Sequence, residues 1–275
     1  MDARLRPLPD VDVLTVTFPI PGFGFLPINA FVLHADEPVL IDTGPTLDGE
    51  GKPLIDRFMA ALADALDPAD IRWIWLTHTD QDHVGALNHV LEAAPRARVV
   101  TTFVGAGKMT LFNPLPMDRV LLLNPGQRLD VGDRTLTAFK PPTYDAPETT
   151  GFFDHESGVL FSSDSFGALL SSPQADARDL SAEELRDGQI LWATVDSPWL
   201  HQVGETAFAR GLEAIKAFSP RAVFSSHLPP AFEMTERLIE TLDAARGAPL
   251  FVGPDQQQLE AMLGEITDTP PPVVT

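Results

Sequence analysis

The stretch that decides the fold is Leu76-Thr77-His78-Thr79-Asp80-Gln81-Asp82-His83-Val84-Gly85-Ala86-Leu87. Residues 71–76 are rich in β-branched and aromatic side chains, which favours a strand, and residues 84–93 carry apolar side chains at helical spacing. Two imidazoles and two carboxylates therefore lie on a strand-to-helix turn. A capped helix would explain Asp82, because a carboxylate is favoured near a helix start. It would not explain His78, Asp80 and His83, so we predict a metal site here.

Three later stretches also end a strand in a polar residue. Asp145 follows a strand in the Pro-rich loop 141–149, Asp164 ends the apolar strand 158–163, and His227 ends the strand 222–226. Functional groups commonly lie at strand ends, on loops held by a rigid scaffold. Taken singly, Asp145 and Asp164 would be turn residues. Together with the first stretch they form a plausible coordination set.

Composition sets the broad class of the protein. With 275 residues, 44% of them hydrophobic, the chain can bury a large core. We expect a single domain over residues 1–267 and a flexible Pro- and Thr-rich tail over residues 268–275. A net charge of −20 disfavours nucleic acid and anionic membranes as partners. The absence of cysteine excludes disulfides and thiolate metal sites. Without a recognisable signal peptide or an apolar run of ~18 residues, we expect a cytoplasmic protein.

Elsewhere the patterns predict regular structure and several isolated polar residues. Helices are expected over residues 54–66, 182–192, 234–246 and 256–263, and strands over residues 11–18, 29–33, 38–41, 98–102, 119–123 and 135–139. The Gly- and Pro-rich residues 21–27 are expected to form a loop over the mouth of a site. Asp42, which ends the strand 38–41, could orient a metal ligand or close an Asx turn. His34 is expected in a solvated turn, and His89 is expected to be structural. Trp199 and His201 could face the metal pocket, but core packing is favoured for Trp199 and an exposed helical face for His201.

These motifs resemble the metallo-β-lactamase superfamily. The turn from His78 to His83 resembles its signature, and Asp42 lies where the superfamily carries an early strand-end aspartate. Asp80, in place of a second histidine, resembles the diiron branch, which comprises flavodiiron proteins and related oxygen-binding diiron proteins. The intervals from Asp82 to Asp145 and from there to Asp164 resemble those between the flavodiiron ligands. The resemblance implies a four-layer αββα sandwich, in which two mixed β-sheets lie face to face with helices outside.

The resemblance also implies a set of ligands for two metal ions. One ion would be bound by His78, Asp80 and Asp145. The second would be bound by Asp82 and His227, and whether His83 also binds it is left open. Asp164 would bridge the two ions. Asp82 and Asp164 would be the catalytic residues. The family's usual glutamate and histidine are replaced by Asp80 and Asp145, and Tyr144 is the alternative to Asp145. Four carboxylates balance two divalent cations and suit iron or manganese better than zinc, although zinc accepts mixed sets.

The implied function is a diiron protein that reduces or binds O2 or NO. We expect no flavin bound by this chain, so electrons would come from a separate donor protein, and a homodimer stays open. The alternative is a hydrolase that uses a water bridging the metals to attack a small ester, lactone or phosphoester substrate. The hydrolase alternative is weakened by Asp80, which stands in place of the superfamily's usual second histidine. A non-catalytic binding module with a drifted site is disfavoured by the complete set of ligands.

Overall fold

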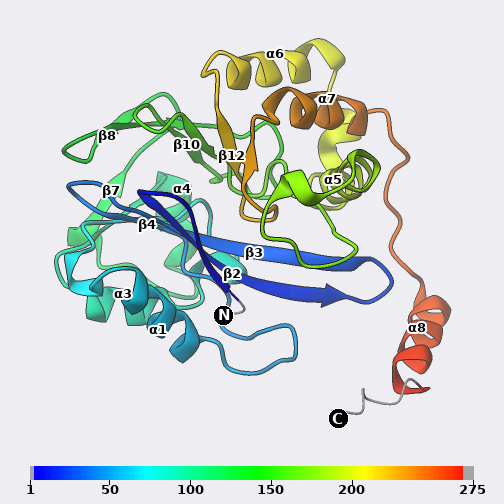
Figure 1. The fold of residues 1–275 in the computed structure, drawn as a ribbon, viewed down its shortest axis with the longest axis horizontal. Helices are drawn as coiled ribbons and strands as arrows, with labels where there is room; N and C mark the ends of the chain where they lie inside the picture. Colours follow the sequence, from blue (N-terminus) through cyan, green and yellow to red (C-terminus); the bar gives the residue numbers. More distant parts are fainter. Residues whose placement is uncertain (1–2, 269–275) are drawn as a thin grey trace.

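The protein is a sandwich of two β-sheets with helices on both outer faces (Figure 1). The computed structural model describes residues 3–268. The first sheet has seven strands in sequence order: β1 (Ala3–Leu8), β2 (Val11–Ile20), β3 (Gly24–Leu33), β4 (Val39–Ile41), β5 (Trp73–Trp75), β6 (Arg98–Thr101) and β7 (Val120–Leu122). The second sheet has six, in the order β13-β12-β11-β10-β9-β8. These are β8 (Arg128–Asp130), β9 (Thr135–Phe139), β10 (Gly151–Asp154), β11 (Val159–Phe161), β12 (Ala222–Phe224) and β13 (Ala231–Phe232).

Helices connect the strands. The α-helices are α1 (Ile55–Ala65), α2 (Gln81–Val84), α3 (Leu87–Ala93), α4 (Phe103–Met109), α5 (Ala182–Asp196), α6 (Glu205–Lys216), α7 (Thr235–Ala245) and α8 (Gln256–Asp268). Short 3-10 helices cover Pro68–Asp70, Met117–Arg119, Ala177–Asp179 and Pro198–Gln202. None of the helices in residues 3–268 combines the length and apolar character that crossing a bilayer requires.

Both sheets are mixed. In the first, β1 to β4 pair antiparallel and β4 to β7 pair parallel. In the second, β11 and β12 are parallel and the remaining pairs are antiparallel. Parallel neighbours point their carboxyl ends to the same edge, so the loops that follow β4, β5, β11 and β12 can meet there.

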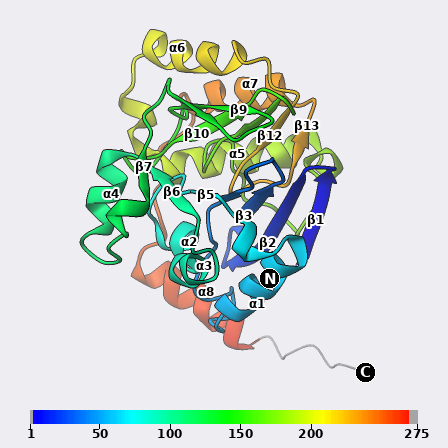
Figure 2. The same cartoon turned by 90° about the vertical axis from the view of Figure 1, so that its left-hand side faces the viewer.

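The three largest apolar clusters divide the molecule into four layers. Side chains alternate along each strand, so Leu40 faces α1 and α3 while Ile41 faces the other sheet. Likewise Leu160 packs toward α5, α6 and α7, whereas Phe161 packs between the sheets. Figures 1 and 2 show α1 and α3 outside the first sheet and α6 and α7 outside the second. This arrangement confirms the predicted fold class.

Some local predictions were wrong. Residues 24–27 belong to β3, which pairs with β2 over a long hairpin, and do not form a loop over a site. The predicted helix 84–93 is divided into α2 and α3, which are separated by Gly85 and Ala86. The flexible tail predicted over residues 268–275 stays a prediction, because Asp268 is the last residue of α8 and residues 269–275 lie outside the described residues.

Candidate metal centre

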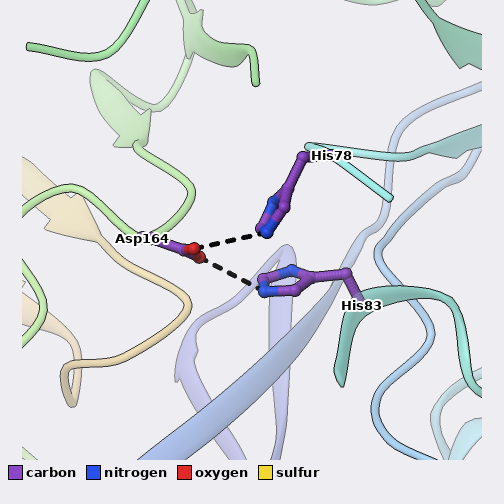
Figure 3. A group of neighbouring side chains, drawn as sticks. All are labelled: His78, His83 and Asp164. Atoms are coloured by element: carbon purple, nitrogen blue, oxygen red, sulfur yellow. Dashed lines mark ion pairs between the residues drawn. The ribbon is translucent and has the colours of Figure 1, made fainter. Parts of the chain in front are cut away.

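Asp164 lies at the centre of the site, and three histidines surround its carboxylate. The Nε2 atoms of His78, His83 and His227 lie 3.3, 3.2 and 3.3 Å from its oxygens. Figure 3 shows the rings of His78 and His83 turned toward this carboxylate. All four residues are almost completely buried. They come from the loop after β5, from α2, and from the loops after β11 and β12, so both sheets contribute to the centre.

The second nitrogen of each histidine contacts a protein oxygen. In His78 the partners are the hydroxyls of Thr77 and Ser163, at 3.2 and 3.3 Å, whereas in His83 and His227 the partner is an oxygen that only accepts. Nδ1 of His83 lies 2.8 Å from Oδ2 of Asp42, and Nδ1 of His227 lies 2.9 Å from the carbonyl oxygen of Pro27. A carboxylate or carbonyl oxygen only accepts, so Nδ1 carries the proton in both rings. Nε2 is the nitrogen left to face Asp164, which is the usual arrangement for a metal-binding imidazole.

Asp42 connects the first sheet to this centre. Its carboxylate accepts hydrogen bonds from the backbone N–H and the hydroxyl of Thr77, at 2.8 and 2.7 Å, as well as from His83. Its φ of 58° lies in the left-handed region, which costs a non-glycine residue backbone energy. The sequence left two alternatives for Asp42, which were orienting a metal ligand and closing an Asx turn. The contact with His83 favours the first.

Two groups of three donors lie next to Asp164. Within each group the potential ligand atoms lie within 4.8 Å of one another. The first group is His78, Asp80 and Asp145, and the second is Asp82, His83 and His227. The structure thus brings all seven nominated residues to one place, and their coordination of metal stays a prediction. The side chains of Asp80 and Asp145 are 45% and 34% exposed, and that of Asp82 in the second group is 31% exposed, so both groups have a carboxylate that reaches solvent.

Two buried atoms at the centre lack a hydrogen bond. Within the described part of the chain, Nε2 of His83 and Oδ1 of Asp164 make none of acceptable geometry, although they lie 3.2 Å apart. Buried polar atoms normally have a partner, and a divalent cation would satisfy both. Imidazole nitrogens together with carboxylate oxygens suit divalent first-row metals. The residues therefore fit a pair of such cations.

The charges of the site act strongly on one another. Burial would raise the pKa of Asp164, but the three histidines hold it well below its usual range. Burial would lower the pKa of His83, but Asp82 and Asp164 raise it well above its usual value. Burial, together with Asp164 and Asp80, raises the pKa of Asp145 to about 6. Such strongly shifted groups are typical of functional sites.

The structure adds one residue that the sequence did not indicate, Asp196. Its carboxylate lies within 4.8 Å of those of Asp145 and Asp164. Burial and these two carboxylates raise its pKa well above the usual value. In the sequence it is a single acidic residue four positions beyond the predicted helix 182–192, and no motif surrounds it. Only the packing of α5 against the second sheet shows where it lies.

The loop that carries Asp145 is held from three sides. The ammonium group of Lys140 donates to the carbonyl oxygens of Pro147 and Thr149 at 2.9 and 3.0 Å. The buried Glu148 accepts from the ammonium group of Lys108 on α4 at 2.5 Å and from the hydroxyl of Thr79 at 2.7 Å. These contacts fasten the Asp145 loop to the loop that bears His78 and Asp80.

The other candidate residues lie outside the two donor groups. The ring of Tyr144 packs against Trp199 at 4.9 Å between centroids, and Nε1 of Trp199 donates to the carbonyl oxygen of Tyr144 at 2.7 Å. His89 is exposed on α3, and His201 is partly buried in the 3-10 helix after α5. Asp145 and Tyr144 were the two residues that could take the place of the family's usual histidine. The geometry favours Asp145, which lies in the first donor group, over Tyr144, which packs against Trp199.

Comparison with known proteins identifies a family and several relatives. The model of the ODP family beta lactamase matches residues 27–227. The coenzyme F420H2 oxidase of Methanocaldococcus jannaschii is 31% identical over 201 residues, which cover 70% of this chain and 48% of that protein. The Methanothermobacter marburgensis enzyme of the same name is 29% identical over 163 residues, covering 58% of this chain and 39% of the enzyme. The chain thus spans half or less of the length of these curated relatives.

Solved structures share the fold. Rubredoxin oxygen:oxidoreductase from Desulfovibrio gigas superposes with a TM-score of 0.75 at 18% identity, covering 90% of this chain and 62% of that one. The flavodiiron protein from Giardia intestinalis gives a TM-score of 0.75 at 17% identity, with 90% and 60% covered. At these identities the likeness concerns the fold.

Proposed function

Because the chain belongs to the ODP family of β-lactamase-fold proteins, we propose that it is an oxidoreductase with two iron ions in the Asp164 centre, acting on O2 or NO. Relatives named as oxidases, and a structural neighbour named for oxygen reduction, support this choice of chemistry. Four carboxylates, three in the two donor groups and that of Asp164, favour iron over zinc.

The observation that carries the proposal is the convergence of three imidazole nitrogens on one buried carboxylate, with a donor group beside it on each side. In this arrangement the two carboxylate oxygens of Asp164 can bind different ions. His83 and His227 have their Nδ1–H groups fixed by Asp42 and Pro27, so they offer Nε2 without reorientation. A preorganised set of donors of this kind is what a metal centre needs.

An iron pair held by these residues would supply electrons to a diatomic ligand such as O2 or NO. The protein determines access, because Asp80 and Asp145 are partly exposed while His78 and Asp164 are buried. Asp82 of the second group is 31% exposed as well, so a small ligand would reach the centre past the aspartates of both groups. Full reduction of O2 to water requires more electrons than an iron pair stores. A separate electron-donor protein is part of the proposal for that reason.

The test is O2 consumption by protein reconstituted anaerobically with Fe²⁺. With a chemical reductant in excess, the wild type should consume O2 or NO catalytically. Asp164→Asn should lower the rate at least tenfold, because one shared oxygen is replaced by an amide nitrogen. The matched control is Asp64→Asn on the exposed face of α1, which should leave the rate unchanged.

The hydrolase alternative makes the opposite prediction. Protein loaded with Zn²⁺ would then hydrolyse small esters, lactones or phosphoesters, and iron-loaded protein would consume neither O2 nor NO. That pair of results would contradict the proposal.

A further inference from the structure

A third carboxylate faces Asp145 and Asp164 from a different part of the fold. Asp196 is the last residue of α5, a helix that covers the outer face of the second sheet. One turn earlier, the indole N–H of Trp192 donates to the carbonyl oxygen of Asp164 at 3.0 Å. This bond anchors the end of α5 beside the metal centre, so the position of Asp196 is fixed by packing.

The position is unfavourable for a carboxylate without a cation. The carboxyl end of a helix carries partial negative charge, which repels an acidic side chain in its last turn. Asp145 and Asp164 add two further negative groups within 4.8 Å. Within the described residues, the Asp196 carboxylate accepts a hydrogen bond from the hydroxyl of the neighbouring Ser197, at 2.9 Å. The three histidines surround Asp164, and the neutral hydroxyl of Ser197 does not balance the further charge that Asp196 adds.

A cation at the first donor group would remove this cost. We propose that Asp196 is an additional carboxylate ligand for the ion bound by His78, Asp80 and Asp145. The inference rests on the proposed metal pair and adds one residue to it. A second buried feature supports a cation here, because Nε2 of the buried His78 faces Oδ2 of Asp164 at 3.3 Å and Oδ1 of Asp145 at 3.9 Å. With Asp196 the site holds five aspartates and three histidines, a set that favours hard divalent ions such as Mn²⁺ and Fe²⁺.

The experiment is a Mn²⁺ titration of the metal-free protein, in which free Mn²⁺ is followed by its EPR signal. The wild type should bind two ions per chain. In Asp196→Asn, which keeps the shape and removes the charge, one of the two sites should weaken by roughly 10- to 100-fold. The matched control is Asp187→Asn, an exposed aspartate on the same helix, which should bind like the wild type.

Thermal unfolding provides the second readout. Asp196→Asn should raise the Tm of the metal-free protein, because it removes one of three repelling carboxylates. It should also reduce the increase in Tm that Mn²⁺ produces. A purely structural carboxylate would do the reverse: its loss would lower the Tm of the metal-free protein, or prevent folding, and leave the effect of Mn²⁺ unchanged.

The outcomes separate this inference from the proposed function. If the wild type binds two ions and Asp196→Asn binds both equally well, or if the variant is less stable without metal, Asp196 is not a ligand. If the wild type binds no Mn²⁺ and no Fe²⁺, the metal pair itself is wrong, and the inference falls with it.

Discussion

At the scale of single residues, the centre combines buried charges with fixed imidazole orientations. His83 is the clearest case: Asp42 accepts from its Nδ1, while its Nε2 faces Asp164 without a hydrogen bond. The sequence predicts this residue as part of a motif but leaves its binding role open. Its orientation depends on Asp42, which is distant in the chain, and local spacing does not determine that contact.

A second buried carboxylate, far from the centre, has a purely structural environment. Asp12 is fully buried and accepts from Arg4 at 3.1 Å, from Arg6 at 2.5 Å and from His34 at 2.7 Å. His34 is therefore partly buried and paired, and the expectation of a solvated turn residue was wrong. Burial would raise the pKa of Asp12, but these partners lower it to about 2.

This lowered pKa predicts how stability depends on pH. The folded pKa lies below the unfolded value, so the contribution of Asp12 is fully present above about pH 4 and is lost as pH falls toward 2. In metal-free protein, Asp12→Asn should lower the free energy of unfolding by about 2 kcal/mol at pH 7. Urea unfolding between pH 7 and 3 should show this difference shrinking below pH 4. A difference independent of pH would contradict the account, and Asp64→Asn should show none.

At the scale of elements, the turn between α2 and α3 places the second donor group. The backbone N–H of Gly85 donates to the carbonyl oxygen of Gly44 at 2.7 Å, which brings the loop after β4 against α2. A Cβ at Gly85 would lie 2.5 Å from backbone atoms of Gly44, Pro45 and Thr46. The helical spacing of residues 84–93 predicted one continuous helix, because spacing does not report this close approach.

Gly85→Ala should therefore push α2 away from the loop after β4. We expect a loss of about 1–3 kcal/mol in the free energy of unfolding, as for other overpacked sites. Mn²⁺ binding should weaken too, since α2 carries Asp82 and His83. The matched control is Gly107→Ala in α4, where a Cβ would meet nothing within 4 Å. That change should stabilise the protein by up to ~1 kcal/mol. Unchanged stability in Gly85→Ala would refute the packing argument.

The strand β3 shows another limit of sequence patterns. Gly24 and Pro27 indicate a loop by local rules, yet both lie in the hairpin with β2. Pro27 is tolerated because β4 pairs only with residues Phe31–Leu33, so no third strand needs its missing N–H. Its carbonyl oxygen accepts from His227. The stretch that was wrongly predicted to be a loop thus orients His227, one of the candidate metal ligands.

At the scale of the whole molecule, the fold class could be predicted because the motif from His78 to His83 and the later strand ends resemble the metallo-β-lactamase superfamily, and the resemblance implies its fold. The alternation of residues in β4, β11 and β12 between two clusters follows from the strand period. The first strand, β1, was not predicted, since Arg4, Arg6 and Pro7 interrupt its apolar pattern. Asp196 was not predicted either, because its place depends on how α5 packs.

The central claim is that donors from both sheets bind a pair of ions around Asp164. The most direct measurement is anomalous diffraction at the iron edge from crystals grown anaerobically with Fe²⁺. We predict two peaks, one beside His78 and Asp145 and one beside Asp82 and His227, both in contact with Asp164. A single peak, no peak, or two peaks away from Asp164 would contradict the account.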